Sequence, residues 1–304
     1  MKKAIILAAG RGTRMKSDSF KVMHEIGGRP MIAGIIDTLT QMQLDELAVV
    51  VSRDMAVVQK VVEPHRTFIQ ENALGTAHAA LAAADMIAPF DGTCFVLFGD
   101  HPLFTKETLE KTQKACEDGC DVVVIGFEPD DAARYGRLIV DELGLEAIVE
   151  YKDATPEQRA IRLCNSGVMC VNGRHLLKLL QQVKNDNASG EFYLTDIVAL
   201  AKKQGLKTGY ILGDKEEVAG VNSRQELAAA EYVFQNRKRR EMMANGVTLL
   251  DPATVYFSFD TQVEKDVVIE PCVFLGTGVY VEKGARILAF SRIENKRVRG
   301  ETQK

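Results

Sequence analysis

The feature that most constrains the fold is an apolar residue at every sixth position near the end of the chain. The seven residues of this repeat are Phe257, Val263, Ile269, Leu275, Val281, Ile287 and Ile293. A six-residue apolar repeat is typical of a left- or right-wound parallel β-helix, in which one apolar side chain per face points inward. Seven consecutive positions argue against ordinary strands that match this period by chance. We therefore expect a β-helix over residues 247–294, about two coils long, followed by a polar tail over 295–304.

The part of the chain before this repeat alternates β-rich and helical patterns. The strand candidates are Ala4–Ala8, Leu47–Val51, Cys94–Phe98 and Val122–Phe127, and the helix candidates are Met31–Met42, Ala77–Ile87 and Lys106–Glu117. Several strand candidates are apolar at consecutive positions, as expected for strands that helices cover on both faces. Strands that alternate with helices predict an α/β fold with a mostly parallel sheet.

A longer helix is predicted between these two parts. Ser223 and Glu226 form a capping box at its start, and Gly246 is a stop signal at its end. The sequence between them contains neither proline nor glycine. The predicted organisation is a domain over 1–222, a linker helix over 223–246 and a truncated β-helix over 247–294.

Charge and cysteine spacing exclude several classes of function. The net charge of -4 argues against a generic nucleic-acid binder. The basic run at 237–240 fits a solvated helix face, with a polyanion site as the alternative. The six cysteines include no C-x-x-C pair, which favours reduced thiols in a cytoplasmic enzyme. No stretch approaches the roughly 20 apolar residues that span a membrane, so we expect no membrane partner. From the net charge we expect no nucleic-acid partner either.

A glycine-containing loop directly after the first strand is the strongest local signal for a binding site. It reads LAAGRGTRM over residues 7–15. Gly10 and Gly12 let the backbone approach a phosphate chain and aim successive N–H groups at it. Arg14 and Lys21 supply positive charge close to this loop. The loop lacks the third glycine of a dinucleotide fingerprint and the Gly-Lys-Ser/Thr of a Walker motif.

Further short motifs follow in a fixed order along the chain. They are Lys21–His24, Gln70 with Leu74–Ala79, Gly99–Asp100, Tyr135–Arg137, Glu150–Ala154, Asn165–Gly167, Gly190–Asp196 and Gly220–Arg224. Together with the glycine loop, these motifs resemble the bacterial bifunctional enzymes that join N-acetylglucosamine-1-phosphate uridyltransferase to glucosamine-1-phosphate acetyltransferase. The resemblance covers nearly the whole chain and implies a Rossmann-like nucleotidyltransferase domain.

The resemblance also implies site residues. Arg14 and Lys21 are implied as catalytic residues, and Asp100 and Asn222 as ligands of Mg²⁺. The implied substrate-binding residues are Leu7, Ala8, Ala9, Gly10, Lys21, Gln70, Gly75, Thr76, Phe98, Gly99, Asp100, Gly136, Glu150, Asn165 and Asn222. Of these, Gly136, Glu150 and Asn165 are implied to position the amino sugar. One carboxylate and one amide oxygen leave room for water and substrate phosphates, as Mg²⁺ prefers.

The reaction that the resemblance implies is transfer of UMP from UTP to N-acetylglucosamine 1-phosphate. It gives UDP-N-acetylglucosamine and pyrophosphate, for cell-wall and lipopolysaccharide precursors. The catalyst must orient two anions and offset their charge. No general base is required, because a phosphate monoester is already ionised at neutral pH. His24 and His78 are therefore expected to form local hydrogen bonds, and His101 to support its neighbour Asp100.

Two departures from the family pattern bear on these expectations. Phe20 stands where the family has a proline, so the loop that carries Lys21 lacks a rigid residue. The chain also ends before the coils that carry acetyl-CoA in the family. We therefore expect no acetyltransferase activity and, at most, a weak form of the family's trimer.

Two other functions stay open at this point. The same fold serves other pairs of nucleotide and sugar phosphate. A non-catalytic sugar-nucleotide binder or assembly subunit is the alternative that the shortened β-helix and Phe20 suggest. The presence of Arg14, Lys21, Asp100 and Asn222 favours an enzyme.

Overall fold

The computed structural model describes residues 1–132, 135–142 and 144–300. Their contacts divide the chain into two compact units. The first unit contains Met1–Met23 and Met31–Asn222, and the second contains His24–Pro30 and the chain from Ser223 onward. In the described part of the chain, no helix combines the length and the apolar sequence that crossing a lipid bilayer would require.

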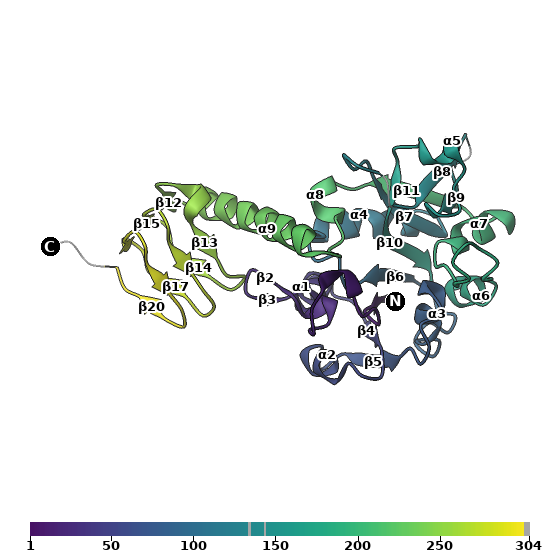
Figure 1. Ribbon diagram of the computed structural model, residues 1–304, viewed down its shortest axis with the longest axis horizontal. Coiled ribbons are helices and arrows are strands. Elements are labelled where there is room, and N and C mark those ends of the chain that lie inside the picture. The colour runs from purple at the N-terminus through teal and green to yellow at the C-terminus, as the bar shows by residue number, and fades with distance from the viewer. Residues whose placement is uncertain (133–134, 143, 301–304) are drawn as a thin grey trace. The chain divides into compact units, whose positions relative to one another are not determined.

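The first unit is built, over its described residues, on a nine-stranded sheet with a central path β11-β7-β10-β6-β1-β4-β5. The strands are β1 (Lys2–Leu7), β4 (Glu46–Val51), β5 (Arg66–Ile69), β6 (Thr93–Phe98), β7 (Val122–Phe127), β8 (Arg137–Asp141), β9 (Gly144–Val149), β10 (Cys164–Asn172) and β11 (Thr208–Leu212). β1 pairs in parallel with β4 and β6, whereas β10 is antiparallel to β6 and β7. The prediction of a mostly parallel sheet is confirmed (Figure 1).

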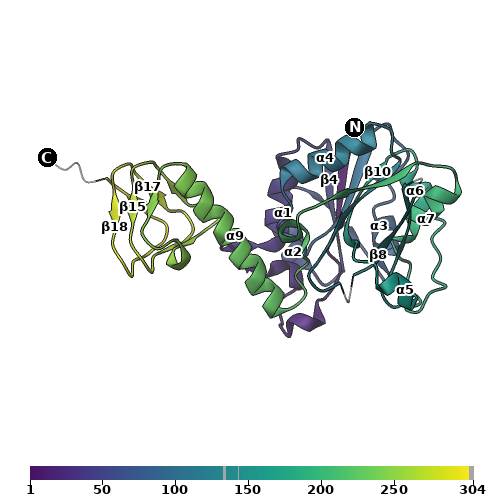
Figure 2. The same cartoon turned by 90° about the horizontal axis from the view of Figure 1, so that it is seen from above.

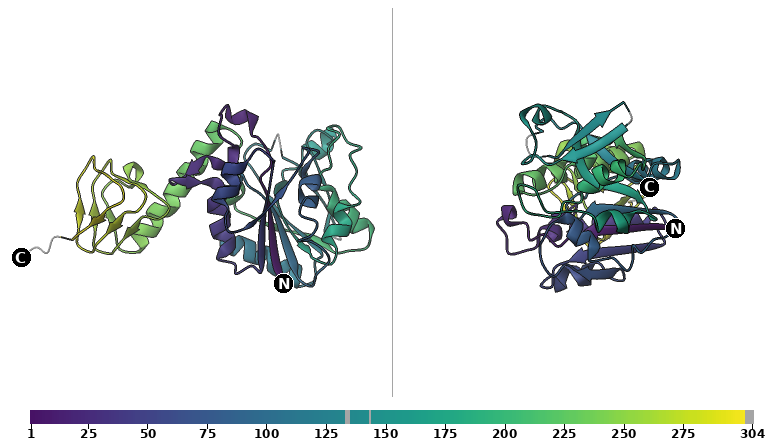
Figure 3. Two further views of the ribbon diagram at one scale, coloured as in Figure 1. Left: turned by 90° about the horizontal axis from the view of Figure 1, so that it is seen from below. Right: turned by 90° about the vertical axis from the view of Figure 1, so that its right-hand side faces the viewer.

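Helices cover both faces of this sheet (Figure 2, with further views in Figure 3). They are α1 (Met31–Thr40), α2 (Ala56–Val61), α3 (Thr76–Leu81), α4 (Lys106–Glu117), α5 (Pro156–Arg159), α6 (Leu176–Leu180), α7 (Asp196–Lys203) and α8 (Lys215–Val218), with short 3-10 turns η1 (Thr13–Met15) and η2 (Lys21–Met23). α1, α2 and α4 bury one face through a cluster that includes Ile32 and Leu109. α3, α6 and α7 bury the other through a cluster that includes Ala80 and Ile197.

The strand order reverses at β1. From β1 the chain moves outward through β4 to β5, and then returns to β6 on the other side of β1. Leu7 and Phe98, the last residues of β1 and β6, are paired neighbours. Open α/β sheets bind their ligands beyond the carboxyl ends of the strands at such a switch point. The loops that follow Leu7 and Phe98 carry predicted site residues, and both begin at this edge.

One helix of the first unit is shorter than predicted. The helix expected over Ala77–Ile87 ends as α3 at Leu81. Beyond it the chain forms successive turns in which Met86 and Ile87 are buried. The Lys3 ammonium donates to the Met86 carbonyl at 2.9 Å. Packing of this segment therefore overrides the helix propensity of its alanines.

The second unit contains the long helix α9 (Arg224–Ala244). The Ser223 hydroxyl accepts a hydrogen bond from the Glu226 N–H at 3.2 Å, which caps the start of the helix. Gly246 has a φ of +88°, and its N–H donates to the Met243 carbonyl. The Val247 N–H donates to the Met242 carbonyl. These two bonds form the Schellman motif that commonly ends a helix at glycine. The helix thus begins and ends at the signals that the sequence carries.

A parallel β-helix follows α9, as the six-residue repeat predicts. Its strands are β12 (Thr248–Leu249), β13 (Tyr256–Phe257), β14 (Gln262–Val263), β15 (Val268–Ile269), β16 (Phe274–Leu275), β17 (Tyr280–Val281), β18 (Arg286–Ile287), β19 (Arg292–Ile293) and β20 (Arg297–Val298), with η3 (Pro252–Thr254) before β13. They form three sheets of three strands each, so the described part makes three coils. Repeat residues such as Phe257 and Leu275 fill the interior.

The β-helix departs from the prediction in two ways. It makes three coils rather than about two, and the polar tail expected over 295–304 is wrong at 297–298, where β20 pairs with β17. Both differences arise where the spacing is not six. Leu249 precedes Phe257 by eight residues, and Val298 follows Ile293 by five. A strict six-residue repeat cannot detect these positions.

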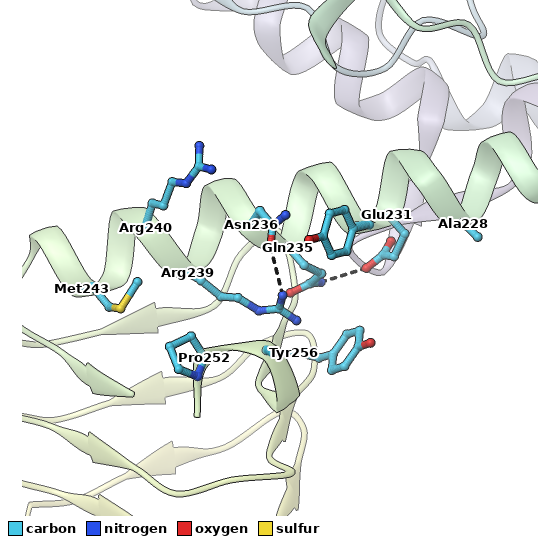
Figure 4. Close-up of a pocket in the computed structure, with 11 residues that line it drawn as sticks. Ala228, Glu231, Gln235, Asn236, Arg239, Arg240, Met243, Pro252 and Tyr256 are labelled. Carbon is cyan, nitrogen blue, oxygen red and sulfur yellow. Dashed lines mark hydrogen bonds between the residues drawn. The ribbon is translucent and has the colours of Figure 1, made fainter. Parts of the chain in front are cut away.

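A short hairpin from the N-terminal part of the chain completes the second unit. It consists of β2 (Glu25–Ile26) and β3 (Arg29–Pro30), which pair in antiparallel fashion. β2 contacts α9 (Figure 1). A cleft of about 670 Å³ lies between α9 and the first coil, lined by Tyr232, Arg239, Tyr256 and their neighbours (Figure 4). No residue predicted for the site lines this cleft.

Candidate active site

Four side chains that the sequence predicts for the phosphates meet in the first unit. The Asn222 Oδ1 accepts a hydrogen bond from Arg14 Nη2 at 2.9 Å and another from Lys21 Nζ at 3.1 Å. The Lys21 ammonium also forms an ion pair with the Asp100 carboxylate. The Lys21 and Asp100 side chains are only 15% and 11% exposed, whereas Arg14 is exposed. Two cations therefore lie beside two acceptor oxygens. The contact of Lys21 with Asp100 is partly buried, and that of Arg14 with Asn222 is exposed.

Gly12 brings the glycine loop against the Lys21 side chain. The φ of Gly12 is +72°, and a Cβ at this position would lie 2.5 Å from the Lys21 Cβ. Only glycine fits there without displacing the lysine. Phe20, which precedes Lys21 in the chain, packs against the buried cluster between the sheet and α1. Its carbonyl accepts from the Met23 N–H at 2.9 Å. Packing of Phe20 thus anchors the turn that a proline stiffens in the family.

Asp100 is held as an ionised carboxylate. Its backbone carbonyl accepts from the Val221 N–H at 2.8 Å, which joins the two loops that carry Asp100 and Asn222. The His101 Nδ1 lies 2.9 Å from the Asp100 Oδ1. Burial opposes the charge, but His101 and Lys21 outweigh it and hold the pKa of Asp100 well below its usual range. The carboxylate is therefore charged at neutral pH.

The same oxygens suit a metal ion. Over the residues that the structure describes, no group of three or more His, Cys, Asp or Glu comes together. A metal at this point would take oxygens from Asp100 and Asn222 and complete its shell with water and phosphate, as Mg²⁺ commonly does. The Lys21 ammonium contacts both of these oxygens, so they lie close enough together to coordinate one ion beside it. The residues present fit a Mg²⁺ ion.

The loop after β1 offers backbone groups rather than side chains. Leu7 and Ala8 are buried in the core. The Leu7 carbonyl accepts from the Gly99 N–H, and the Ala8 N–H donates to the Val50 carbonyl. Ala9 is half-buried, and a Cβ on exposed Gly10 would meet nothing within 4 Å. The open part of the loop, where a ligand can approach the backbone, is therefore Ala9 and Gly10.

Gln70, Gly75 and Thr76 are brought together at the start of α3. The Gln70 amide nitrogen donates to the Gly75 carbonyl at 3.1 Å and lies 3.2 Å from His78 Nδ1. Among the described residues, none donates to the Gln70 Oε1. The Thr76 hydroxyl accepts from the Leu194 N–H at 2.8 Å. Gln70 is thus fixed by its nitrogen, and its oxygen can accept a hydrogen bond from a ligand.

The three residues predicted for the amino sugar also lie together. The Asn165 N–H donates to the Gly136 carbonyl at 2.8 Å, and a Cβ on Gly136 would lie 3.4 Å from the Glu150 carboxylate. Asn165 sits in β10 beside a shift in its register with β7, so it is a strand residue at an irregularity. Its Oδ1 accepts from the Gly167 N–H at 2.9 Å. No described residue accepts from its Nδ2, which can donate to a ligand.

Glu150 is a partly buried carboxylate without a cation. Burial raises the pKa of Glu150, and the charges of Asp196 and Asp153 add to this effect. Within the described residues, no lysine or arginine forms an ion pair with it. The Thr195 hydroxyl donates to the Glu150 Oε1 at 3.2 Å. Sequence reasoning missed this contact, although Thr195 belongs to the Gly190–Asp196 motif.

Phe98 links the residues around Asp100, which are predicted for the phosphates, to those around Asn165, which are predicted for the amino sugar. A Cβ on Gly167 would lie 2.6 Å from the Phe98 ring, and the centroids of the Phe98 and His101 rings are 5.9 Å apart. Gly99 fits tightly as well, since a Cβ there would lie 2.9 Å from Val22. The structure thus places the residues of each predicted group in contact with one another, and Phe98 joins the residues around Asp100 to those around Asn165.

Comparisons with known proteins give matches over most of the chain. A family model described as MobA-like NTP transferase domain matches residues 4–204. The bifunctional protein GlmU of Paramagnetospirillum magneticum is 50% identical over 292 residues, which cover 95% of this chain and 65% of that protein. The proteins of the same name from Brucella anthropi and Rhodospirillum rubrum are 47% and 54% identical, and the matches cover 96% and 87% of this chain and 65% and 60% of those proteins.

The chain therefore spans just under two thirds of the length of these curated relatives. The resemblance that the motifs indicated is confirmed by these matches. The α/β nucleotidyltransferase fold is confirmed as well, since the family model covers most of the first unit.

Proposed function

Because the chain belongs to the family of MobA-like NTP transferase domains, we propose that it transfers the uridylyl group of UTP to N-acetylglucosamine 1-phosphate with Mg²⁺ as cofactor. Nucleotidyl transfer is the chemistry of the family. The nucleotide, the sugar phosphate and the metal are the parts that we propose. The products are UDP-N-acetylglucosamine and pyrophosphate.

The observation that carries the proposal is the convergence of Arg14 and Lys21 on the Asn222 Oδ1, with Asp100 paired to the same lysine. A triphosphate and a sugar phosphate repel each other, so a site that joins them must supply positive charge at a fixed place. Lys21 supplies it from a buried position and Arg14 from an exposed one. We assign Lys21 to the reacting phosphate and Arg14 to the phosphates nearer solvent.

The reaction needs orientation more than covalent help. An oxygen of the sugar 1-phosphate forms a bond to the α-phosphorus of UTP, and the bond from that phosphorus to the bridging oxygen of pyrophosphate breaks. Asp100 and Asn222 would hold Mg²⁺, which neutralises phosphate charge and orients the phosphates. The fixed Lys21 ammonium stabilises the charge that develops on the phosphates, at little cost of reorganisation.

The two remaining groups of residues select the substrates. The Gln70 Oε1 can accept the imide N–H of uracil, since its nitrogen is held by the Gly75 carbonyl. Asn165 Nδ2 and the Glu150 carboxylate offer one donor and one acceptor to the amino sugar. Glu150 faces no cation among the described residues, which suits a neutral sugar with N–H and O–H donors.

Pyrophosphate release over a panel of nucleoside triphosphates and sugar 1-phosphates tests the proposal. We expect the pair of UTP and N-acetylglucosamine 1-phosphate to give the largest kcat/KM. Another pair with a kcat/KM about tenfold higher would show that a different substrate is used. A chain that binds the nucleotide but releases no pyrophosphate with any pair would be a binder and not an enzyme.

Replacing Asn165 tests the sugar assignment. Asn165→Ala is expected to raise KM for N-acetylglucosamine 1-phosphate by about tenfold or more, because a hydrogen bond in the site is lost. KM for UTP should stay near the wild-type value. Steady-state kinetics with each substrate varied in turn measures both constants.

Asn165→Asp is the matched control for this prediction. Aspartate keeps an oxygen for the Gly167 N–H but has no Nδ2 donor. If the donor binds the sugar, the aspartate variant also loses affinity for the sugar phosphate. An aspartate variant with wild-type kinetics would leave Asn165 only its structural bond to the Gly167 N–H.

A further inference from the structure

Two of the points where the chain passes between the units lie next to the phosphate site. The chain enters the second unit after Met23, returns after Pro30 and enters it again after Asn222. Lys21 stands two residues before the first of these crossings, and Asn222 stands at the last. The chain therefore enters the second unit shortly after Lys21 and directly after Asn222, the two residues whose side chains touch in the site.

Within the second unit, these two segments are joined directly after they cross. The Arg224 Nη1 donates to the His24 Nδ1 at 3.3 Å. His24 follows Lys21 by three residues, and Arg224 follows Asn222 by two. The Lys21 Nζ donates to the Asn222 Oδ1 at 3.1 Å. The same two stretches of chain are thus tied twice, once in each unit.

The hairpin that contains His24 is fixed further along as well. The Gly27 N–H donates to the Glu231 Oε2 at 2.8 Å, and the Glu231 Oε1 accepts from Gln235 Nε2 at 2.8 Å (Figure 4). The Ser258 hydroxyl donates to the Gly27 carbonyl at 2.9 Å. A Cβ on Gly27, whose φ is +59°, would clash with the Phe234 ring. The tip of the hairpin therefore has one defined place against α9 and the first coil.

His24 is held by this contact at some cost. Its ring is buried, and among the described residues no group bonds to its Nε2. Burial lowers the pKa of His24, and the charge of Arg224 lowers it further. The neutral ring accepts from Arg224 with Nδ1 and carries its proton on the unpaired Nε2. A buried donor without a partner is unfavourable, so the contact with Arg224 holds the ring in place against this cost.

We propose that His24 and Arg224 form a clasp that positions Lys21 and Asn222 for nucleotidyl transfer, so that both are positioning residues of the reaction. The inference rests on the proposed function for its kinetic test. Only two residues separate Lys21 from His24 and one separates Asn222 from Arg224, so a displacement of the clasp reaches the site over a short length of chain. Misplacement of a reacting group by about 1 Å can cost on the order of 10²-fold in rate.

The test compares Arg224→Ala, Arg224→Lys and Gln225→Ala in the full chain. Gln225 is the matched control, because it is the exposed neighbour of Arg224 in the first turn of α9. We expect Arg224→Ala to lower kcat by about 10- to 100-fold with little change in either KM. Lysine can still donate to His24 and should restore much of the rate. In a Lys21→Met background, the Arg224→Ala substitution should cause a clearly smaller loss, because part of its effect acts through Lys21.

Hydrogen exchange provides a readout that does not depend on turnover. Amides over 19–30 should exchange faster in Arg224→Ala than in the wild type, and at the wild-type rate in Gln225→Ala. Unchanged exchange in Arg224→Ala, or a kcat within about twofold of the wild type, would overturn the clasp. A wild-type chain that turns over no substrate pair would overturn the proposed function alone, and the exchange data would then decide whether the clasp exists.

Discussion

Alanine in place of Asp100 is expected to lower kcat by roughly 10²- to 10³-fold while the protein stays folded. The carboxylate holds the Lys21 ammonium and is the one charged ligand that the described residues offer to Mg²⁺ at this site. Without it, Lys21 keeps, among the residues that the structure describes, only its bond to Asn222, and the metal loses its strongest protein ligand. Pyrophosphate release at several Mg²⁺ concentrations measures the loss, and circular dichroism shows whether the fold persists.

Two controls distinguish a loss of metal binding from a loss of folding. Asp118→Ala removes an exposed aspartate of the same unit and should leave kcat unchanged. Binding of Mn²⁺ in the presence of UTP, followed by electron paramagnetic resonance, reports on the metal without turnover, and it should weaken in Asp100→Ala only. Near wild-type turnover of Asp100→Ala in Mg²⁺ would remove Asp100 from the site.

The sequence predicts the groups of the site better than the contacts within them. Asp100 could be placed because it follows a buried strand of a parallel sheet, where ligand sites lie. Lys21 and Asn222 are 201 residues apart in the chain, and no spacing rule relates them. The motifs indicated that both belong to the site, and only the structure shows that their side chains touch.

The elements that escaped prediction are short or irregular. β2 and β3 have two residues each, which is too little for a strand period to appear. The segment 24–30 therefore gave no sign that it leaves the first unit. The place of Asn165 at an irregularity of β10 could not be predicted, because a shift of register cannot be read from composition. Thr195 was missed for a related reason, since its contact with Glu150 crosses 45 residues.

Removing the Lys21 ammonium should have an effect on kcat comparable to that of Asp100→Ala. Lys21→Met keeps most of the buried stem and removes the charge, so we expect a loss on the order of 10²- to 10³-fold in kcat with small changes in both KM values. The Asp100 carboxylate and the Asn222 amide would remain, so the metal ligands are intact. Mn²⁺ binding in this variant should therefore persist, which distinguishes it from Asp100→Ala.

Gly12→Ala should reproduce this loss in kcat without replacing a charged residue. The glycine has a φ of +72°, and an added Cβ would lie 2.5 Å from the Lys21 Cβ, so either the loop or the lysine must move. Gly205→Ala is the matched control, because Gly205 has a similar φ of +76° and a Cβ there meets no atom within 4 Å. If Lys21 acts from a fixed position, Gly12→Ala lowers kcat far more than Gly205→Ala does, and adding it to Lys21→Met changes little. Equal kinetics of the two glycine variants would mean that Lys21 works from a mobile position, and its role would then be general attraction of phosphates.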